Sequence, residues 1–167
     1  MQHHRHTLEI DATPEEAWAV LHPPPPRRNA DGRRLLVHGD VSIEVLHDGD
    51  DHGQGLVRTC TFQVPKWLLT GGVGRSWETI VESRPYEEVR YIAVGKPLWS
   101  KAEGAHLFEE VGGGRTRITF EESYEAFSRL SAVLFERRVH EFISHNNERL
   151  IRQALDQGVK RLRKKRA

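Results

Sequence analysis

The sequence predicts an α+β fold, in which an antiparallel sheet of seven strands is combined with a short helix after the first strand and a long C-terminal helix. Two patterns indicate this class. Six runs with strand character follow one another with only short turn-forming segments between them, and the C-terminal part has apolar residues at helical spacing without a proline. We expect a single domain over 1–167, because a chain of this length can bury one compact core.

The first strand and the short helix are indicated by local chemistry. His6 to Asp11 alternates as a strand does. Thr13 then offers an N-cap, Pro14 fits the first helical position, and Glu16 completes a capping box. The helix must end at His22, because the four prolines that follow lack backbone donors.

The strand runs that follow are bounded by glycine, proline and aspartate, which favour tight turns. Most neighbours should therefore pair as antiparallel hairpins in a meander. The six runs are Val41–His47, Leu56–Val64, Arg75–Ser83, Val89–Gly95, Ala105–Val111 and Thr116–Tyr124.

From Ala132 to Arg163 the pattern predicts one long helix. Its apolar arc contains two polar residues, Asn146 and Asn147, which would be costly in a dry core unless a partner satisfies them. Asn146 either meets a ligand or bonds neighbouring backbone. The other members of the arc are Phe135, Val139, Phe142, Ile143, Leu150, Ile151 and Ala154, with Leu155 at its edge.

The composition does not fit a disordered chain or a general nucleic-acid-coating protein: 37% of residues are hydrophobic, 29% are charged, and the net charge is +1. Cys60 is the only cysteine, which excludes an internal disulfide and fits a reducing cytoplasm. We find no signal peptide and no run of about 20 apolar residues. A cytoplasmic protein is therefore expected.

The order of elements resembles the START-like (SRPBCC, Bet v 1-like) superfamily, in its polyketide cyclase/dehydrase and lipid-transport branch. The resemblance covers nearly the whole chain and is most specific in HTLEIDATPEEAWAVL, GGGRTRITFEESYEA and FERRVHEFISHNNERLIRQAL. It implies a helix-grip fold, in which a curved sheet wraps around the long helix and leaves a cavity. The segment HPPPP departs from the branch, where many members have an aspartate and a tryptophan that help to close the pocket.

The resemblance implies a carrier or sensor of a small hydrophobic or amphipathic ligand, such as a lipid, a polyketide or an isoprenoid, without a cofactor. The alternatives are a cyclase, dehydratase or hydrolase on the same scaffold, and an interaction module that uses the apolar loops and the basic helix end at 160–167. That helix end is either solvated or makes a weak contact with an anionic membrane surface; no specific nucleic acid is expected. The protein is expected to be a monomer or a homodimer.

Alternation indicates which residues line the cavity. On the last strand Ile118, Phe120, Glu122 and Tyr124 share one face, which we take as the inner one. Tyr91 shares a face with Val89 and Ala93. For the third run the inner set is either Trp77, Thr79 and Val81 or the opposite set with Ile80. The predicted ligand-binding residues are Trp77, Tyr91, Phe120, Tyr124, Val139, Phe142, Ile143, Asn146 and Leu150.

In an antiparallel meander, alternate connections lie at the same end of the sheet. The segments PKWLLTGGVG, KPLWSKAEG and AFSRLSAV should therefore lie together, and they are unusually apolar for surface loops. This indicates the entrance of a cavity or, alternatively, side chains that fold inward and close that end of the sheet. The predicted entrance residues are Trp67, Leu68, Leu98, Trp99 and Phe127.

Glu122, His140 and Tyr124 are the candidates for acid–base catalysis, although a bulge could turn Glu122 to solvent. Three other signals are set aside. GGVGRS lacks the lysine and the following helix of a phosphate loop, and Cys60 reads as a core thiol. The terminal cluster HHRH is expected to be loosely held, so no metal site is predicted.

Overall fold

The computed structural model describes residues 2–38, 41–64, 66, 71–96, 99–126 and 137–166. Its elements are β1 (Gln2–Ile10), α1 (Pro14–Leu21), β2 (Leu35–His38), β3 (Val41–Asp48), β4 (Leu56–Gln63), β5 (Val73–Arg84), β6 (Glu88–Lys96), β7 (Trp99–Gly112), β8 (Arg115–Ala126) and α3 (Arg137–Arg166). No helix in the described part of the chain is long and apolar enough to cross a membrane.

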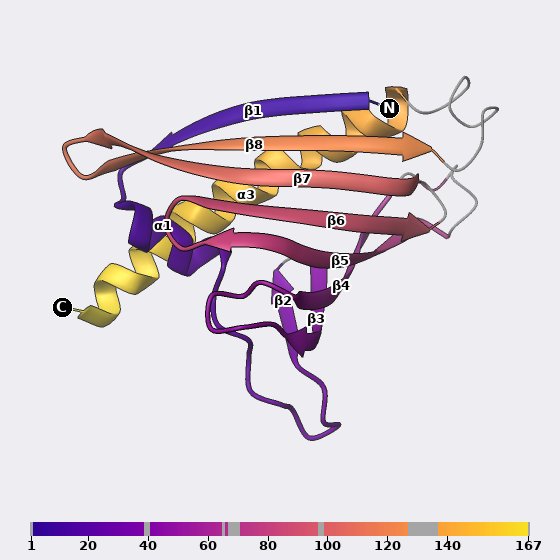
Figure 1. Ribbon diagram of the computed structural model, residues 1–167, viewed down its shortest axis with the longest axis horizontal. Coiled ribbons are helices and arrows are strands. Elements are labelled where there is room, and N and C mark those ends of the chain that lie inside the picture. Colours follow the sequence, from indigo (N-terminus) through magenta and orange to yellow (C-terminus); the bar gives the residue numbers. More distant parts are fainter. Residues whose placement is uncertain are drawn as a thin grey trace.

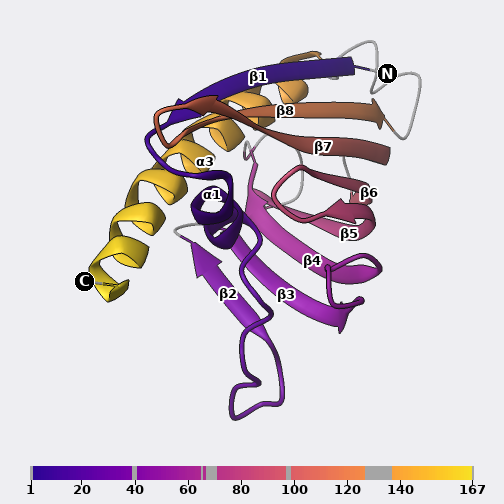
Figure 2. The same cartoon turned by 60° about the vertical axis from the view of Figure 1, so that its left-hand side comes forward.

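Within these residues the strands form one eight-stranded antiparallel sheet in the order β1-β8-β7-β6-β5-β4-β3-β2. The sheet curves around α1 and α3, which lie on the same side of it (Figure 1 and Figure 2). The α+β helix-grip fold predicted from the sequence is confirmed.

The predicted number of seven strands is wrong by one. The additional strand, β2, is an edge strand that pairs only with β3, with Leu36 opposite Ile43. It has only four residues and follows an arginine-rich connection, so its apolar run was too short to stand out from its polar surroundings.

The short helix α1 begins and ends where the sequence predicts. The Thr13 side chain accepts a hydrogen bond from the Glu16 N–H, and the Glu16 carboxylate accepts one from the Thr13 N–H. At the other end the N–H of His22 donates to the carbonyl of Trp18 at 2.7 Å. These bonds satisfy backbone groups that a helix end leaves open.

The apolar core lies where α1, α3 and the strands β1, β7 and β8 meet. Gly158 on α3 allows α1 to approach closely, because a Cβ there would lie 2.5 Å from a methyl carbon of Val20. The fully packed members of the core are Leu8, Ala17, Phe108, Ile118, Phe120 and Leu155. Leu155, which the sequence places at the edge of the helical arc, is only 1% exposed.

The predicted entrance falls largely outside the described residues. The end of β6 and the start of β7 lie at the same end of the sheet as the end of β8 (Figure 1). Of the five entrance residues, only Trp99 belongs to a described element, where it begins β7. The other four, Trp67, Leu68, Leu98 and Phe127, lie in segments outside the described part.

Candidate functional site

The inner face of the sheet is identified by its burial. On β8, Ile118 and Phe120 have no exposed surface and Glu122 is 6% exposed. On β6, Val89 and Ala93 are buried, whereas Ile92 between them is 45% exposed. The predicted inner faces of these two strands are therefore confirmed, including the side shared by Glu122 and Tyr91. The alternative that Glu122 turns to solvent is wrong.

A row of side chains crosses the inner face at one register position. Tyr91 on β6 is paired with Gly104 on β7, which is paired with Glu122 on β8. A Cβ on Gly104 would lie 2.2 Å from the Tyr91 ring, so only glycine allows the ring to cross β7. The Tyr91 hydroxyl then donates to Glu122 Oε1 at 3.5 Å.

Glu122 lies between two phenols. Tyr124, two positions further along β8, also forms a side-chain hydrogen bond with Glu122. Burial, followed by the charge of Glu122, raises the pKa of both Tyr91 and Tyr124 well above the ordinary value. Both phenols therefore keep their protons and act as hydrogen-bond donors inside the protein.

A part-buried ion pair between Arg58 on β4 and Glu78 on β5 extends the polar surface onto these two strands. Arg58 Nε donates to Glu78 Oε2 at 2.8 Å, and the Ser76 hydroxyl donates to Glu78 Oε1 at 2.9 Å. Burial acts to raise the pKa of Glu78, but the Arg58 charge and these hydrogen bonds outweigh it and lower the pKa. Glu78 is therefore ionised, and the pair keeps a fixed positive and negative charge inside the molecule.

Two histidines complete the polar set. His106 Nδ1 on β7 and His22 Nε2 at the end of α1 lie 3.2 Å apart. Burial is the largest cause that lowers the pKa of His106, to about 3, and that of His22 well below its ordinary value. Both rings are therefore neutral at pH 7, and one donates its N–H to the other.

Small residues stand beside these polar groups. Ala93 on β6 and Ala102 on β7 are buried, with Phe62, Tyr91 and Tyr124 packed against them. Large aliphatic side chains gather instead near α1, in the core described above. The inner face is thus apolar and tightly packed near α1, and polar over small residues farther along the strands.

Two of the predicted lining residues are corrected by the structure. Trp77 lies on the outer face of β5 and is 38% exposed, while its neighbour Ser76 is 2% exposed. The opposite set, with Ile80 at 5% exposed, faces inward. Phe120 does face inward, but it has no accessible surface and packs in the apolar core, so it lines no open space.

The helical candidates are described only in part. Leu150 is half-buried on α3, and the neighbouring Ile151 packs against the apolar core. The backbone of the other candidates belongs to α3, but their side chains are outside the described part of the structure. These are Val139, His140, Phe142, Ile143 and Asn146.

The sequence reasoning missed Arg58, Glu78 and His106. Alternation along Leu56–Val64 places Arg58 on the same face as Cys60, which is 8% exposed. The alternation therefore indicates that Arg58 faces inward, but charged residues on a strand are ordinarily expected to face solvent. Cys60 is a buried free thiol, as predicted, and burial raises its pKa.

Comparison with solved structures identifies the fold. A START superfamily protein from Mycobacterium smegmatis superimposes with a TM-score of 0.67 at 12% identity, covering 96% of this chain and 98% of the other. A Thermus thermophilus protein, TTHA0849, has a TM-score of 0.67 at 17% identity, covering 96% and 99%. The Zhui aromatase/cyclase from Streptomyces sp. R1128 has a TM-score of 0.60 at 17% identity, covering 96% and 95%.

No known family and no curated protein matches the sequence itself. At these identities the structural matches show the fold alone, which is START-like and SRPBCC-like over nearly the whole chain.

Proposed function

We propose that the protein binds a small hydrophobic or amphipathic molecule between α3 and the inner face of its sheet, as a carrier or sensor. The observation that carries this proposal is the environment of Glu122, which is only 6% exposed. Its carboxylate is hydrogen-bonded to the phenols of Tyr91 and Tyr124, and these rings pack against the small side chains of Ala93 and Ala102. Ligand sites are mostly apolar with a few placed polar groups that set orientation. The START-like fold adds support, because proteins with this fold include aromatase/cyclases.

The polar groups indicate the kind of ligand. The hydroxyl protons of Tyr91 and Tyr124 are directed to Glu122, so a ligand oxygen that displaces one of these bonds receives a hydrogen bond from the phenol, and a ligand hydroxyl can donate to the carboxylate of Glu122. A molecule with hydroxyl or carbonyl groups on an apolar body satisfies both. Among lipids, isoprenoids and polyketides, an oxygenated polyketide-like compound therefore fits best.

A pair of matched substitutions tests the site. Tyr91→Phe and Tyr86→Phe each remove one hydroxyl, but Tyr86 is 47% exposed on a turn. Binding would be measured calorimetrically with a fatty acid, an isoprenoid alcohol and a phenolic polyketide-like compound. We expect Tyr91→Phe to weaken binding of the phenolic compound about tenfold, the worth of one hydrogen bond, and Tyr86→Phe to leave it unchanged.

Two results would refute the proposal. One is equal affinity of the wild type and Tyr91→Phe for every compound that binds. The other is a protein that binds none of the three classes and also carries no small molecule in native mass spectrometry after gentle purification from its host.

A second candidate function is cyclisation or dehydration of such a ligand, and the same carboxylate supports it. Glu122 would take a proton from the carbon beside a carbonyl, while a phenol donates a hydrogen bond to the carbonyl oxygen. The resulting enolate would attack a second carbonyl carbon of the same molecule, and the alkoxide formed would take the proton back from Glu122. Turnover of a polyketone substrate that survives Glu122→Gln would exclude this role.

We also infer a cytoplasmic location, because Cys60 is a free and buried thiol. The basic helix end offers exposed Lys160, Arg161 and Lys164 to solvent. A weak contact with anionic vesicles that is lost when 164–167 are deleted would support the membrane-surface alternative.

A further inference from the structure

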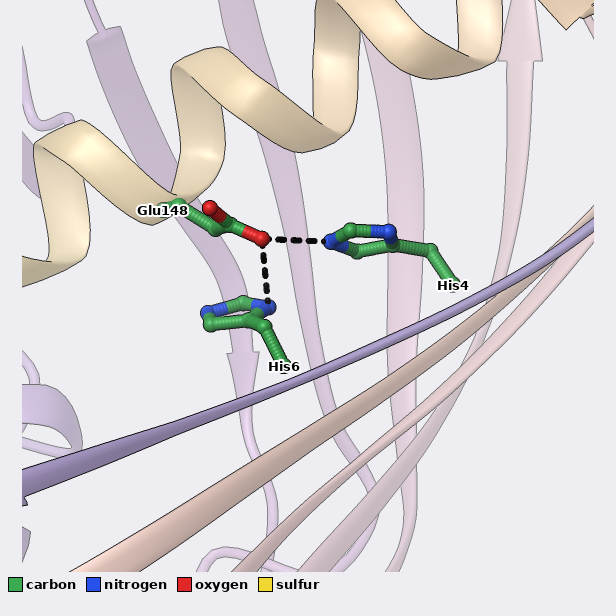
Figure 3. A group of neighbouring side chains, drawn as sticks. All are labelled: His4, His6 and Glu148. Carbon is green, nitrogen blue, oxygen red and sulfur yellow. Dashed lines mark hydrogen bonds and ion pairs between the residues drawn. The ribbon is translucent and has the colours of Figure 1, made fainter.

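Two histidines from β1 and a carboxylate from α3 converge on the helix side of the sheet. His4 and His6 are two positions apart, so both point to the same face of β1, and Glu148 faces them from the helix (Figure 3). His4 Nε2 lies 2.8 Å from Glu148 Oε1, and His6 Nδ1 lies 3.7 Å from the same oxygen. The three possible ligand atoms all lie within 4.8 Å of one another.

The histidines are held in an ordered strand. β1 pairs with β8 along its whole length, with His4 opposite Glu122 and His6 opposite Phe120. The His6 ring also stacks on Phe120 at a centroid distance of 4.6 Å. The sequence argument that the HHRH cluster is loosely held is therefore wrong for these two residues.

His6 has an unusual environment. Its side chain is only 8% exposed, and neither of its ring nitrogens has a hydrogen-bond partner in the described residues. A buried imidazole has one donor and one acceptor to satisfy, and leaving both open costs free energy. Buried polar groups that lack a protein partner are often satisfied by a bound ion or water. Here an ion beside Glu148 would bond the nitrogen that faces it.

We propose that His4, His6 and Glu148 bind a divalent transition-metal ion such as Zn²⁺. Imidazole nitrogen suits zinc and its neighbours, whereas calcium and magnesium prefer oxygen ligands. In a tetrahedral zinc site with bonds of about 2.0–2.2 Å, two ligand atoms lie about 3.3–3.6 Å apart. The His6–Glu148 separation of 3.7 Å is already near this value, the His4–Glu148 separation of 2.8 Å would have to open, and the longest separation, which is within 4.8 Å, would have to shorten by about 1 Å, which side-chain rotation can supply.

Three protein ligands leave at least one coordination position for water or another molecule. His4 is paired with Glu122 across β1 and β8, so the three proposed ligands adjoin the polar row of the candidate ligand site. The metal proposal does not depend on the proposed ligand, and the two are tested separately.

One nearby charge opposes the ion. Arg152, four residues after Glu148 on α3, acts electrostatically on His6. A positive charge close enough to act on His6 also repels an ion bound there, which weakens binding. Neutralising the residue with Arg152→Gln is therefore expected to tighten zinc binding, whereas a site elsewhere on the chain would not respond.

The test uses the full chain without any affinity tag, titrated with Zn²⁺ by calorimetry and with Co²⁺ by visible absorption. We expect one ion per chain and a higher Tm on zinc addition. His4→Gln and Glu148→Gln should each lower the affinity at least tenfold, because metal ligands are lost. His3→Gln is the matched control, since His3 is exposed and bonds Ser123 on β8 instead.

Glu148→Gln keeps the hydrogen-bonding shape of a half-buried helical residue, so circular dichroism should show an unchanged fold. The proposal is overturned if zinc does not bind, if Glu148→Gln binds as tightly as the wild type, or if His3→Gln weakens binding as much as His4→Gln. The last result would mean that the terminal histidines capture metal without the helix.

Discussion

His22 and His106 are part-buried partners whose neutral rings lie 3.2 Å apart, close to the positive charge of Arg58. Protonating either ring in the folded protein would place a second cation next to Arg58, away from water. The unfolded chain has no such restriction, so its histidines take up protons near the ordinary pKa of about 6.5. The pair therefore links folding to pH.

This linkage predicts a loss of stability in mild acid. Between pH 6.5 and the folded pKa of about 3, the unfolded state holds a proton on His106 that the folded state does not. The free energy of unfolding should therefore fall as the pH falls, by about 1.4 kcal/mol per pH unit for this one proton. In urea unfolding at pH 7, 6, 5 and 4, His106→Gln should give a shallower slope by that amount.

His52, on an exposed turn, provides the control. His52→Gln should keep the wild-type slope. If His106→Gln keeps it as well, protonation of other groups explains the acid sensitivity, and the buried pair contributes nothing to it.

At the scale of elements, the packing of β6, β7 and β8 depends on one glycine. Gly104 lets the ring of Tyr91 pass over β7, so a side chain from one strand reaches a carboxylate two strands away. On β5, the pairing with β6 shifts register between Ile80 and Glu82, so Val81 has no partner on β6. Such a bulge adds a residue without a partner, and simple alternation fails beyond it.

Substitution of Gly104 should reveal this contact. Gly104→Ala places a methyl group 2.2 Å from the Tyr91 ring, so the ring or the strand must move. We expect a loss of about 1–3 kcal/mol in the free energy of unfolding, as for other overpacked sites, measured by urea denaturation.

The double variant Gly104→Ala with Tyr91→Leu tests whether the loss comes from a clash with the Tyr91 ring. With the ring removed, the alanine has room, so the combined loss should be smaller than the sum of the two single losses. If the two single losses in unfolding free energy simply add, Gly104 is required by the backbone of β7 and not by the ring of Tyr91.

At the scale of the whole molecule, the two sides of the sheet differ in how far their side chains are covered from solvent. β8 lies between β1 and β7 and carries Ile118 and Phe120, which have no exposed surface. β2 is a four-residue edge strand in which Val37 is 62% exposed. The curved sheet therefore has a well-covered side near the helices and a weakly held edge.

Hydrogen exchange measured by mass spectrometry should follow this difference. Amides of β8 are expected to exchange through global unfolding and those of β2 through local opening, so β2 should exchange at least tenfold faster. The expectation fails if peptides from the two strands exchange at the same rate in native buffer.

Much of the fold was predictable because it depends on local chemistry. Thr13, Pro14 and Glu16 specify where α1 begins, and the prolines after His22 specify where it ends. Alternation along β8 identified the inward Glu122, because successive side chains of a strand point to opposite faces. The part of the candidate site on β6 and β8, with Tyr91, Glu122 and Tyr124, was predictable for the same reason.

The remaining parts of the site depend on which faces and elements meet. Trp77 is apolar and was a reasonable inward residue, yet it lies outside, because the opposite face of β5 carries Glu78 to meet Arg58. Burial of that charge pair is stabilised by the partner on another strand, which no single strand pattern contains.

The sequence by itself determined the order of elements, the caps of α1, and the polar row on β6 and β8, since each follows from neighbours along one strand or helix. Only the tertiary structure decided that β2 joins the sheet and that Arg58 and Glu78 turn inward. It also brought His4 to Glu148, 144 positions away. The physical reason is that contacts between distant segments depend on how the sheet curves around α3, which local spacing along the chain does not specify.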